Sequence, residues 1–392
     1  MYKTETKDIR NQFPRSENRE HSVPLYLTSS FVFEDAEQGR ALFANEISGN
    51  IYSRFSNPNT TEFVGKMCSL EKMDDGFAFA SGMAALFAGF AGLLKSGDHI
   101  LASRALFGST YQILVKILSR WGITTSFVNA TQPEEWESKI NKNTKMLFIE
   151  TPSNPGLDIV DLSLAQQLKN KYNLILFIDN TFATPILQTP ADYGADLIAH
   201  SATKYIDGQG RACGGVIVGK QELIDEVRFF ARQTGPSMAP FNAWLFSKSL
   251  ETLSLRMERH CSNALALARE LDQNQHLTYV RYPGLESHPQ FLLAQKQMKG
   301  PGGIVTFLLK GGYDRAQKFI DSLQVISKTA NLGDTRSVAT HPSSTTHSKL
   351  TVEEQEQVLI YPGLVRISVG LESSEDIIED VTQAIKKSEK GK

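Results

Sequence analysis

Lys204 is the residue whose surroundings best suit covalent chemistry, because it ends the segment Ser201-Ala202-Thr203-Lys204 just after the apolar run Leu197-Ile198-Ala199. Alternate side chains of an extended chain share a face, so Ser201 and Thr203 would direct two hydroxyls toward one anion beside an amine. A lysine at the end of a buried strand can lose its charge by desolvation and then attack a carbonyl to form a Schiff base. On this segment alone, a surface lysine is an equally good interpretation.

An acid lies about 25 residues earlier, where the apolar run from Leu174 to Ile178 ends on Asp179. An unpaired carboxylate at the end of a buried strand is costly, so Asp179 needs a cation or several hydrogen-bond donors. The protonated ring nitrogen of pyridoxal phosphate is a cation that pairs with such an acid. Taken alone, Asp179 could equally be a metal ligand or a helix cap.

The third element is Ser81-Gly82-Met83, where an uncharged strand turns into a helix. The first backbone N–H groups of a helix are unpaired, and the helix dipole favours an anion there. Many strand-to-helix turns contain Ser-Gly, so this turn is a weak signal by itself. A phosphate cradle, an acid and a lysine in this order along one sheet together predict a pyridoxal phosphate site.

These residues need a sheet that brings strand ends together. Short apolar runs alternate with helical stretches such as Tyr111 to Trp121 and Leu162 to Tyr172, which is typical of a mostly parallel α/β sheet covered by helices on both faces. A ligand should then bind at the carboxyl ends of the strands. The predicted strands are Phe77–Ala80, His99–Leu101, Thr124–Val128, Met146–Ile149, Leu174–Ile178, Leu197–Ala199 and Gly215–Val218.

The rhythm of strands and helices divides the chain into three parts. Residues 1–56 lack it and are interpreted as an arm, not a domain, and residues 57–250 are predicted to form the cofactor-binding domain. Residues 251–392 are predicted to be an α+β domain that caps the substrate. They contain a long helix through Arg256 to Leu271, a strand from Ile304 to Leu309 and an amphipathic helix from Asp314 to Leu323.

Composition excludes several classes of partner. The 392 residues include 41 Lys+Arg and 43 Asp+Glu, a formal charge of −2, so the basic surplus of a nucleic-acid-binding protein is missing. The uncharged run Phe77 to Leu94 is broken by Ser81-Gly82 and is interpreted as strand, turn and helix, not as a membrane span. The polar start predicts a cytoplasmic protein.

No metal is expected either. The three cysteines are widely spaced and form no metal-ligand pattern, and His341 and His347 lie in a Ser/Thr/Pro-rich segment that is better interpreted as a loop.

At this point the sequence resembles the Cys/Met-metabolism family of pyridoxal-phosphate enzymes, over nearly the whole chain. The resemblance implies a type I fold of PLP-dependent transferases, with Asp179 against the ring nitrogen and Lys204 as the Schiff-base lysine. Further cofactor contacts that it implies are Ser81, Gly82, Met83, Asn154, Ser201 and Thr203. The segment Tyr52-Ser53-Arg54 looks like the family segment whose Tyr and Arg reach the cofactor phosphate of a neighbouring subunit, which implies a homotetramer built from dimers that share their active sites.

The resemblance also implies a carboxylate site for an amino-acid substrate at Ser337 and Arg366. Alternation in Leu364 to Val369 places Arg366 and Ser368 on one face, and an arginine fork binds a carboxylate bidentately. Asn154 matches the family residue that binds the ring oxygen, although from its own surroundings it could be a turn former before Pro155.

The chain departs from many γ-lyases of the family in the segment Leu106-Phe107-Gly108-Ser109-Thr110, where those enzymes have a Tyr and a Cys. Phe107 can stack on the cofactor ring but has no hydroxyl with which to protonate a leaving group. A carboxylate leaves without that help, so the substitution favours an acyl ester of homoserine. A succinyl ester has a second carboxylate, for which Arg104 and Arg211 are candidate partners.

The segments Tyr205 to Gly215, Asn11 to Arg15 and His21 to Tyr26 most resemble O-succinylhomoserine sulfhydrylases. The predicted reaction is therefore γ-replacement of the succinyl group of O-succinyl-L-homoserine by sulfide, which yields L-homocysteine and succinate for methionine biosynthesis. Three alternatives stay open: cystathionine γ-synthase with cysteine as the nucleophile, O-acetylhomoserine sulfhydrylase and methionine γ-lyase.

Overall fold

The larger sheet of the computed structural model, which describes residues 3–345, 348, 355 and 360–389, is the predicted mostly parallel sheet. Within these residues seven strands run in the order β1-β7-β6-β5-β4-β2-β3, and only β7 is antiparallel to its neighbours. The strands are β1 (Asp75–Phe79), β2 (His99–Ser103), β3 (Thr124–Val128), β4 (Thr144–Glu150), β5 (Ile175–Asp179), β6 (Leu197–Ser201) and β7 (Gly215–Gly219).

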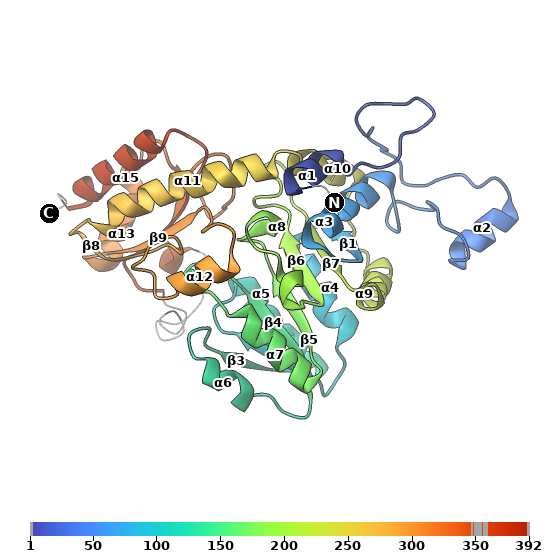
Figure 1. Ribbon diagram of the computed structural model, residues 1–392, viewed down its shortest axis with the longest axis horizontal. Helices are drawn as coiled ribbons and strands as arrows, with labels where there is room; N and C mark the ends of the chain where they lie inside the picture. The colour runs from blue at the N-terminus through green and yellow to red at the C-terminus, as the bar shows by residue number, and fades with distance from the viewer. Residues whose placement is uncertain (1–2, 346–347, 349–354, 356–359, 390–392) are drawn as a thin grey trace.

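Helices cover both faces of this sheet, so each strand supplies side chains to two cores (Figure 1). In β5, Leu176 and Ile178 enter one core, while Phe177 enters the core on the opposite face. The first core is covered by α3 (Pro58–Glu71), α7 (Leu162–Tyr172), α8 (Thr184–Leu187) and α10 (Pro240–Leu250), and the second by α4 (Gly82–Leu93) and α9 (Gln221–Thr234). The α/β class is thereby confirmed.

Two local predictions concern the runs Phe77 to Leu94 and Tyr111 to Trp121. The run Phe77 to Leu94 forms β1, a turn and α4, and no helix in the described part of the chain is long and apolar enough to cross a membrane. The predicted helix Tyr111 to Trp121 is not a regular α-helix. It consists of α5 (Gly108–Gln112), a π-helical turn (Ile113–Ile117) and a 3₁₀ turn (Leu118–Trp121), which ends at Gly122 with a φ of 75°.

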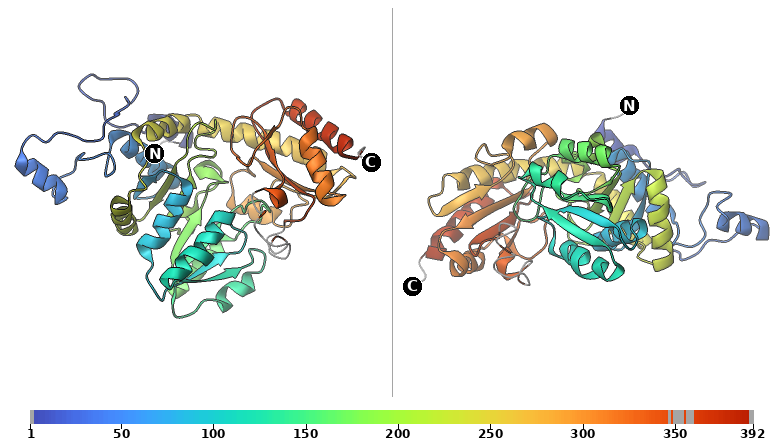
Figure 2. Two further views of the ribbon diagram at one scale, coloured as in Figure 1. Left: turned by 180° about the vertical axis from the view of Figure 1, so that it is seen from behind. Right: turned by 90° about the horizontal axis from the view of Figure 1, so that it is seen from below.

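A second sheet, whose five strands within the described residues run in the order β10-β11-β12-β9-β8, forms the C-terminal part (Figure 2). Its strands are β8 (Leu277–Arg281), β9 (Ile304–Leu309), β10 (Ser327–Lys328), β11 (Val338–Thr340) and β12 (Leu364–Ser368). They pack against α11 (Leu253–Asp272), α13 (Gly312–Ser322) and α15 (Ser374–Glu389). Shorter helices lie at α6 (Pro133–Ser138), α12 (Phe291–Gln297), Pro190–Tyr193 and Pro342–Ser344.

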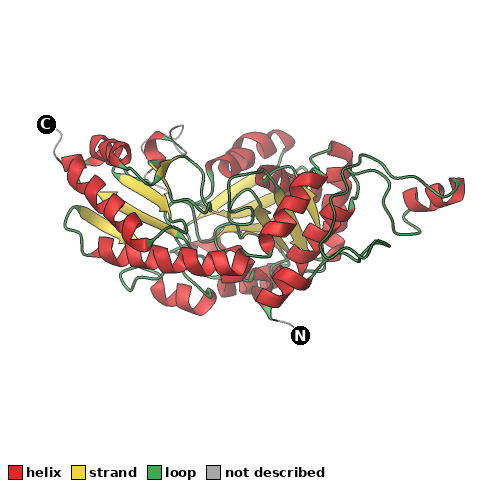
Figure 3. Cartoon of the chain, turned by 90° about the horizontal axis from the view of Figure 1, so that it is seen from above, coloured by secondary structure: helices red, strands yellow, loops and turns green. Residues whose placement is uncertain are grey.

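Helix α11 joins the two parts, because it runs from the large sheet to the small one (Figure 3). Leu253 and Met257 at its start belong to the core under the large sheet, whereas Leu267 and Leu271 belong to the core of the C-terminal sheet. One continuous helix therefore fixes the distance and orientation between the two sheets.

The N-terminal segment extends away from this body. Helix α1 (Thr4–Arg10) packs against α3 and α11, and α2 (Ala36–Phe43) lies at the far end of a long loop (Figure 1). Leu27 is 73% exposed, Val32 99% and Phe43 62%. Such apolar exposure on an extended arm is typical of a surface that another chain covers.

Candidate active site

Two residues predicted to carry chemistry, Asp179 and Lys204, lie at the carboxyl ends of β5 and β6. Glu150, which was not predicted, ends β4 in register with Asp179, and Lys204 follows the end of β6. They line a cavity of about 220 Å³. Its lining is Ser81, Gly82, Met83, Leu86, Phe107, Glu150, Asn154, Asp179, Thr181, Phe182, Ser201, Thr203, Lys204 and Leu332.

One wall of the cavity is the start of α4. The Ser81 hydroxyl oxygen accepts the Ala84 N–H at 3.1 Å and caps the helix, so the first N–H groups after it have no partner within the helix. Only glycine fits at position 82, because a Cβ there would lie 2.7 Å from the Cβ of Ser201. This close approach brings the helix start next to Ser201, where a phosphate cradle was predicted, and the Thr203 hydroxyl of the same cavity donates to the Gly214 carbonyl at 3.3 Å and accepts the Gly214 N–H at 3.0 Å.

Asp179 lies on the floor of the cavity. Its Oδ1 accepts the Thr181 N–H at 3.0 Å and the Thr181 hydroxyl at 2.6 Å. Burial raises the pKa of the Asp179 carboxyl, and the Thr181 hydrogen bonds oppose this shift. A positively charged ring nitrogen placed against Asp179 would offset the burial of its charge.

A buried pair of side chains, His200 and Glu71, lies near Asp179. His200 Nε2 lies 2.6 Å from Glu71 Oε1, and Asn180 donates to the same oxygen at 2.8 Å. Charge on His200 would favour ionised Asp179, since it is among the groups that lower the pKa of that carboxyl after the Thr181 contacts.

Lys204 donates from Nζ to Asn331 Oδ1 at 2.7 Å. Burial, and next the positive charge of Arg366, lower the pKa of Lys204 from 10.5 to about 8. At pH 7 about a tenth of this amine is then neutral, against roughly one part in 3,000 for an ordinary lysine, and the neutral amine is the form that attacks an aldehyde. Asn331 was not predicted from the sequence, although it directly precedes the Leu332-Gly333 segment in which a substrate site was expected.

Arg366 is a residue of β12 and is buried beside Asn154 and Asn331. Its guanidinium donates to Asn154 Oδ1 at 2.9 Å and to the Asn331 carbonyl at 3.0 Å. Burial lowers the pKa of Arg366 to about 10, and its Nε has no partner among the described residues. The guanidinium has no carboxylate partner in the described chain, so it can accept one from a ligand.

Four predicted substrate or phosphate contacts lie elsewhere in the single chain. Arg54 donates to the Arg232 carbonyl and lies 4.6 Å from the Phe55 ring centroid, and Tyr52 is 42% exposed. Arg211 is bound to Asp207, and Arg104 does not line the cavity. Roles for these residues stay predictions.

The Ser337 hydroxyl is engaged away from the cavity. It donates to Glu372 Oε2 at 2.9 Å and accepts the Gly370 N–H at 2.8 Å. A direct contact of this hydroxyl with substrate therefore stays a prediction, whereas Gly333 of the same segment packs on the lysine loop. A Cβ at Gly333 would lie 2.6 Å from the Tyr205 nitrogen, and its φ is 74°.

The histidine loop gives no further site. His341 binds the Ser344 hydroxyl and the Pro362 carbonyl, and His347 lies outside the described residues. Among the residues that the structure describes, no group of three or more His, Cys, Asp and Glu could hold a metal ion.

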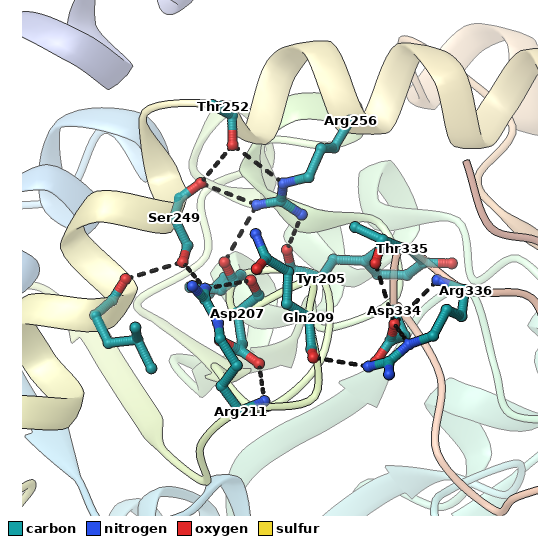
Figure 4. Close-up of polar contacts among 12 residues, drawn as sticks. Tyr205, Asp207, Gln209, Arg211, Ser249, Thr252, Arg256, Asp334, Thr335 and Arg336 are labelled. Carbon is teal, nitrogen blue, oxygen red and sulfur yellow. Dashed lines mark hydrogen bonds and ion pairs between the residues drawn. The ribbon is translucent and has the colours of Figure 1, made fainter. Parts of the chain in front are cut away.

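The loop after Lys204 is clamped from α11 (Figure 4). Arg256 donates to the carbonyls of Tyr205 at 2.6 Å, Ile206 at 3.2 Å and Ser249 at 2.9 Å. From the C-terminal part, Arg336 donates to the Gln209 carbonyl at 2.9 Å. The backbone that carries the lysine is therefore held by both parts of the molecule.

A lysine of lowered pKa, a buried acid beside it and a phosphate cradle at one edge of a parallel sheet define a pyridoxal-phosphate enzyme, and these residues fit that cofactor. The chain belongs to the Cys/Met metabolism PLP-dependent enzyme family, whose model matches residues 5–386.

Similar proteins have more than one activity. The chain is 43% identical over 381 residues to an O-succinylhomoserine sulfhydrylase of Pseudomonas aeruginosa, covering 97% of this chain and 94% of the relative. It is 42% identical over 369 residues to an L-methionine gamma-lyase of Fusobacterium nucleatum, covering 93% of each. A Campylobacter jejuni crystal structure, described as an O-acetylhomoserine (thiol)-lyase with N'-pyridoxyl-lysine-5'-monophosphate, superposes with a TM-score of 0.94 at 34% identity, covering 98% of this chain and all of the other.

Cofactor capture by the apoenzyme should depend on the ionisation of Lys204. Because only the neutral amine attacks an aldehyde, the capture rate should rise with pH through a midpoint of about 8, well below the ordinary lysine value of 10.5. The rate is measured as growth of visible absorbance after addition of pyridoxal phosphate. Lys204→Ala should give no such band, and a midpoint above 10 would contradict the assignment.

Removing the Arg256 clamp should destabilise the fold. Arg256→Met leaves three carbonyls without their donor, and the expected loss in free energy of unfolding is about 3 kcal/mol. Urea unfolding followed by tryptophan fluorescence measures it. Arg259→Met, at an exposed position of the same helix, is the matched control and should change stability little. Equal stability of the two variants would show that the clamp is unimportant.

Proposed function

We propose that this enzyme catalyses γ-replacement on O-succinyl-L-homoserine, with sulfide as the nucleophile, to give L-homocysteine and succinate. The observation that carries the proposal is Phe107, which lines the cavity and has no ionisable group. The similarity to an O-succinylhomoserine sulfhydrylase supports the choice of ester.

The residues of the chain have distinct tasks in this reaction. When bound, the cofactor would hold the substrate amine and supply an electron sink for the carbon next to that amine, Cα. Arg366 holds the substrate carboxylate, and Asp179 keeps the ring nitrogen charged. The free amine of Lys204 would take a proton from Cα and return it at the end of the reaction. Loss of a proton from Cβ would supply the electron pair of a Cβ–Cγ double bond as the Cγ–O electrons leave with succinate. Sulfide would then form the new Cγ–S bond as a proton returns to Cβ.

Phe107 decides which leaving groups can depart easily. Succinate is a stable anion at neutral pH and leaves without a proton, whereas a methanethiolate leaving group benefits from an acid near Cγ. A phenyl ring supplies none. Methionine γ-lyase is the second candidate function because a relative of that activity is 42% identical.

The proposed active site is completed by a second copy of the chain. Tyr52 and Arg54 lie near the end of the arm, residues 1–56, and they do not line the cavity of their own chain. A dimer in which each arm reaches the partner's phosphate cradle, doubled into a homotetramer, would supply the missing cation. The exposed Leu27, Val32 and Phe43 on that arm support such an assembly.

A substrate panel tests the proposed reaction. We expect O-succinylhomoserine with sulfide to give the highest kcat/KM, above O-acetylhomoserine with sulfide and O-succinylhomoserine with cysteine. Methionine, scored by 2-oxobutanoate, should be a poor substrate. Phe107→Tyr adds the missing hydroxyl at constant ring size and should raise turnover of methionine relative to the ester. Faster turnover of methionine than of the ester by the unmodified enzyme would refute the proposal.

Mixed oligomers test the shared site. Lys204→Ala and Arg54→Ala should each be nearly inactive, but subunits refolded together should regain about a quarter of the activity, since half of the dimers are mixed and each has one intact site. Lys204→Ala mixed with Asp179→Asn is the control, because both changes affect the chain's own cavity, and no activity should return. An absence of regained activity in the first mixture would place Arg54 in its own chain's site.

A further inference from the structure

Glu150 is the one ionisable side chain of the cavity lining to which the cofactor and the substrate give no task. Three side chains of that lining are ionisable, Glu150, Asp179 and Lys204, and the proposed reaction assigns Lys204 to the aldehyde and Asp179 to the ring nitrogen. Glu150 is only 5% exposed. A buried carboxylate without a cation is costly, so its surroundings must give a reason for its presence.

Its contacts join two neighbouring strands to the turn that carries Phe107. Glu150 Oε2 accepts the Phe107 backbone N–H at 2.8 Å, and the Glu150 N–H donates to the Ser103 hydroxyl oxygen at 3.3 Å. Phe107 begins α5 without capping it through its side chain, and its ring is 36% exposed. The carboxyl is therefore the group that ties this turn to the end of β4.

We propose that Glu150 is a positioning residue that holds the Phe107 turn, and through it the phenyl ring, against the cofactor. The inference rests on cofactor binding, which the family establishes, and not on the choice of substrate. Because Glu150 ends β4 in register with Asp179 on β5, one side chain links the group that covers the ring to the edge of the sheet that binds its nitrogen.

The neighbouring acid, Asp179, determines whether Glu150 is ionised or protonated when it holds the Phe107 turn. Burial, and next the negative charge of Asp179, raise the pKa of Glu150 well above its ordinary value, while the backbone N–H groups of Phe107 and Asn154 oppose the shift. The pKa of Asp179 is raised by burial without a contribution from Glu150 and is lowered by the Thr181 hydroxyl and N–H and by His200, so Asp179 is the better site for the charge. Protonated Glu150 still accepts the Phe107 N–H through its carbonyl oxygen, so an amide should replace it.

Two variants separate this role from simple loss of fold. Glu150→Ala removes the acceptor and should weaken pyridoxal phosphate binding about tenfold, as expected for one buried hydrogen bond. It should also diminish the circular dichroism of the bound cofactor in the visible region. Glu150→Gln keeps the acceptor and should retain both within about twofold. Urea unfolding of the two apoproteins shows whether either variant is folded.

The double variant tests whether Glu150 acts through Phe107. Phe107→Ala removes the ring that Glu150 positions, so adding Glu150→Ala to it should weaken cofactor binding by less than about twofold. Effects that multiply would overturn the proposal, as would a Gln variant as impaired as the Ala variant. An Ala variant with unchanged cofactor affinity and dichroism would overturn it too.

Discussion

The burial of four ionisable groups at one edge of a sheet, each held by neutral dipoles, is the constraint on which the rest of the structure depends. Asp179 is bound by Thr181, Glu150 by a backbone N–H, Lys204 by Asn331, and Arg366 by Asn154 and carbonyls. Dipoles hold a charge in place without neutralising it. In the proposed reaction the opposite charges would come from ligands, namely a ring nitrogen for Asp179 and a substrate carboxylate for Arg366.

Such a site can be built only if the elements around it cannot move apart. Asp179 and Glu150 come from the large sheet, whereas Asn331 and Arg366 come from the C-terminal part. Helix α11 enters both cores, and its Arg256 binds the carbonyls that follow Lys204. Helix α11 therefore fixes the positions of Lys204 and of Arg366, the arginine whose charge lowers the pKa of that lysine.

Much of the fold and the centre of the site were predictable from the sequence. Strand β3, strand β9 and helix α7 have the predicted bounds, because a run rich in β-branched or apolar residues, or a capped amphipathic pattern, marks each of them. Glu150 and Asn331 were missed for a different reason. Glu150 matters because it ends β4 in register with Asp179, and Asn331 because its amide meets Lys204 across 127 residues of sequence. Pairing of this kind depends on strand order and domain packing, which local patterns do not encode.

The predicted phosphate cradle of a single chain has too little positive charge for a phosphate dianion. A phosphate dianion in the predicted cradle would meet the first N–H groups of α4 and the Ser201 hydroxyl, but a helix end supplies only about half a positive charge. Lys204 is the single cation in the lining, and its reaction with the aldehyde engages it elsewhere. A cation from outside this lining would therefore complete the cradle. The arm that carries Arg54 leaves the body with its apolar side chains exposed, which favours a second copy as the source of that charge.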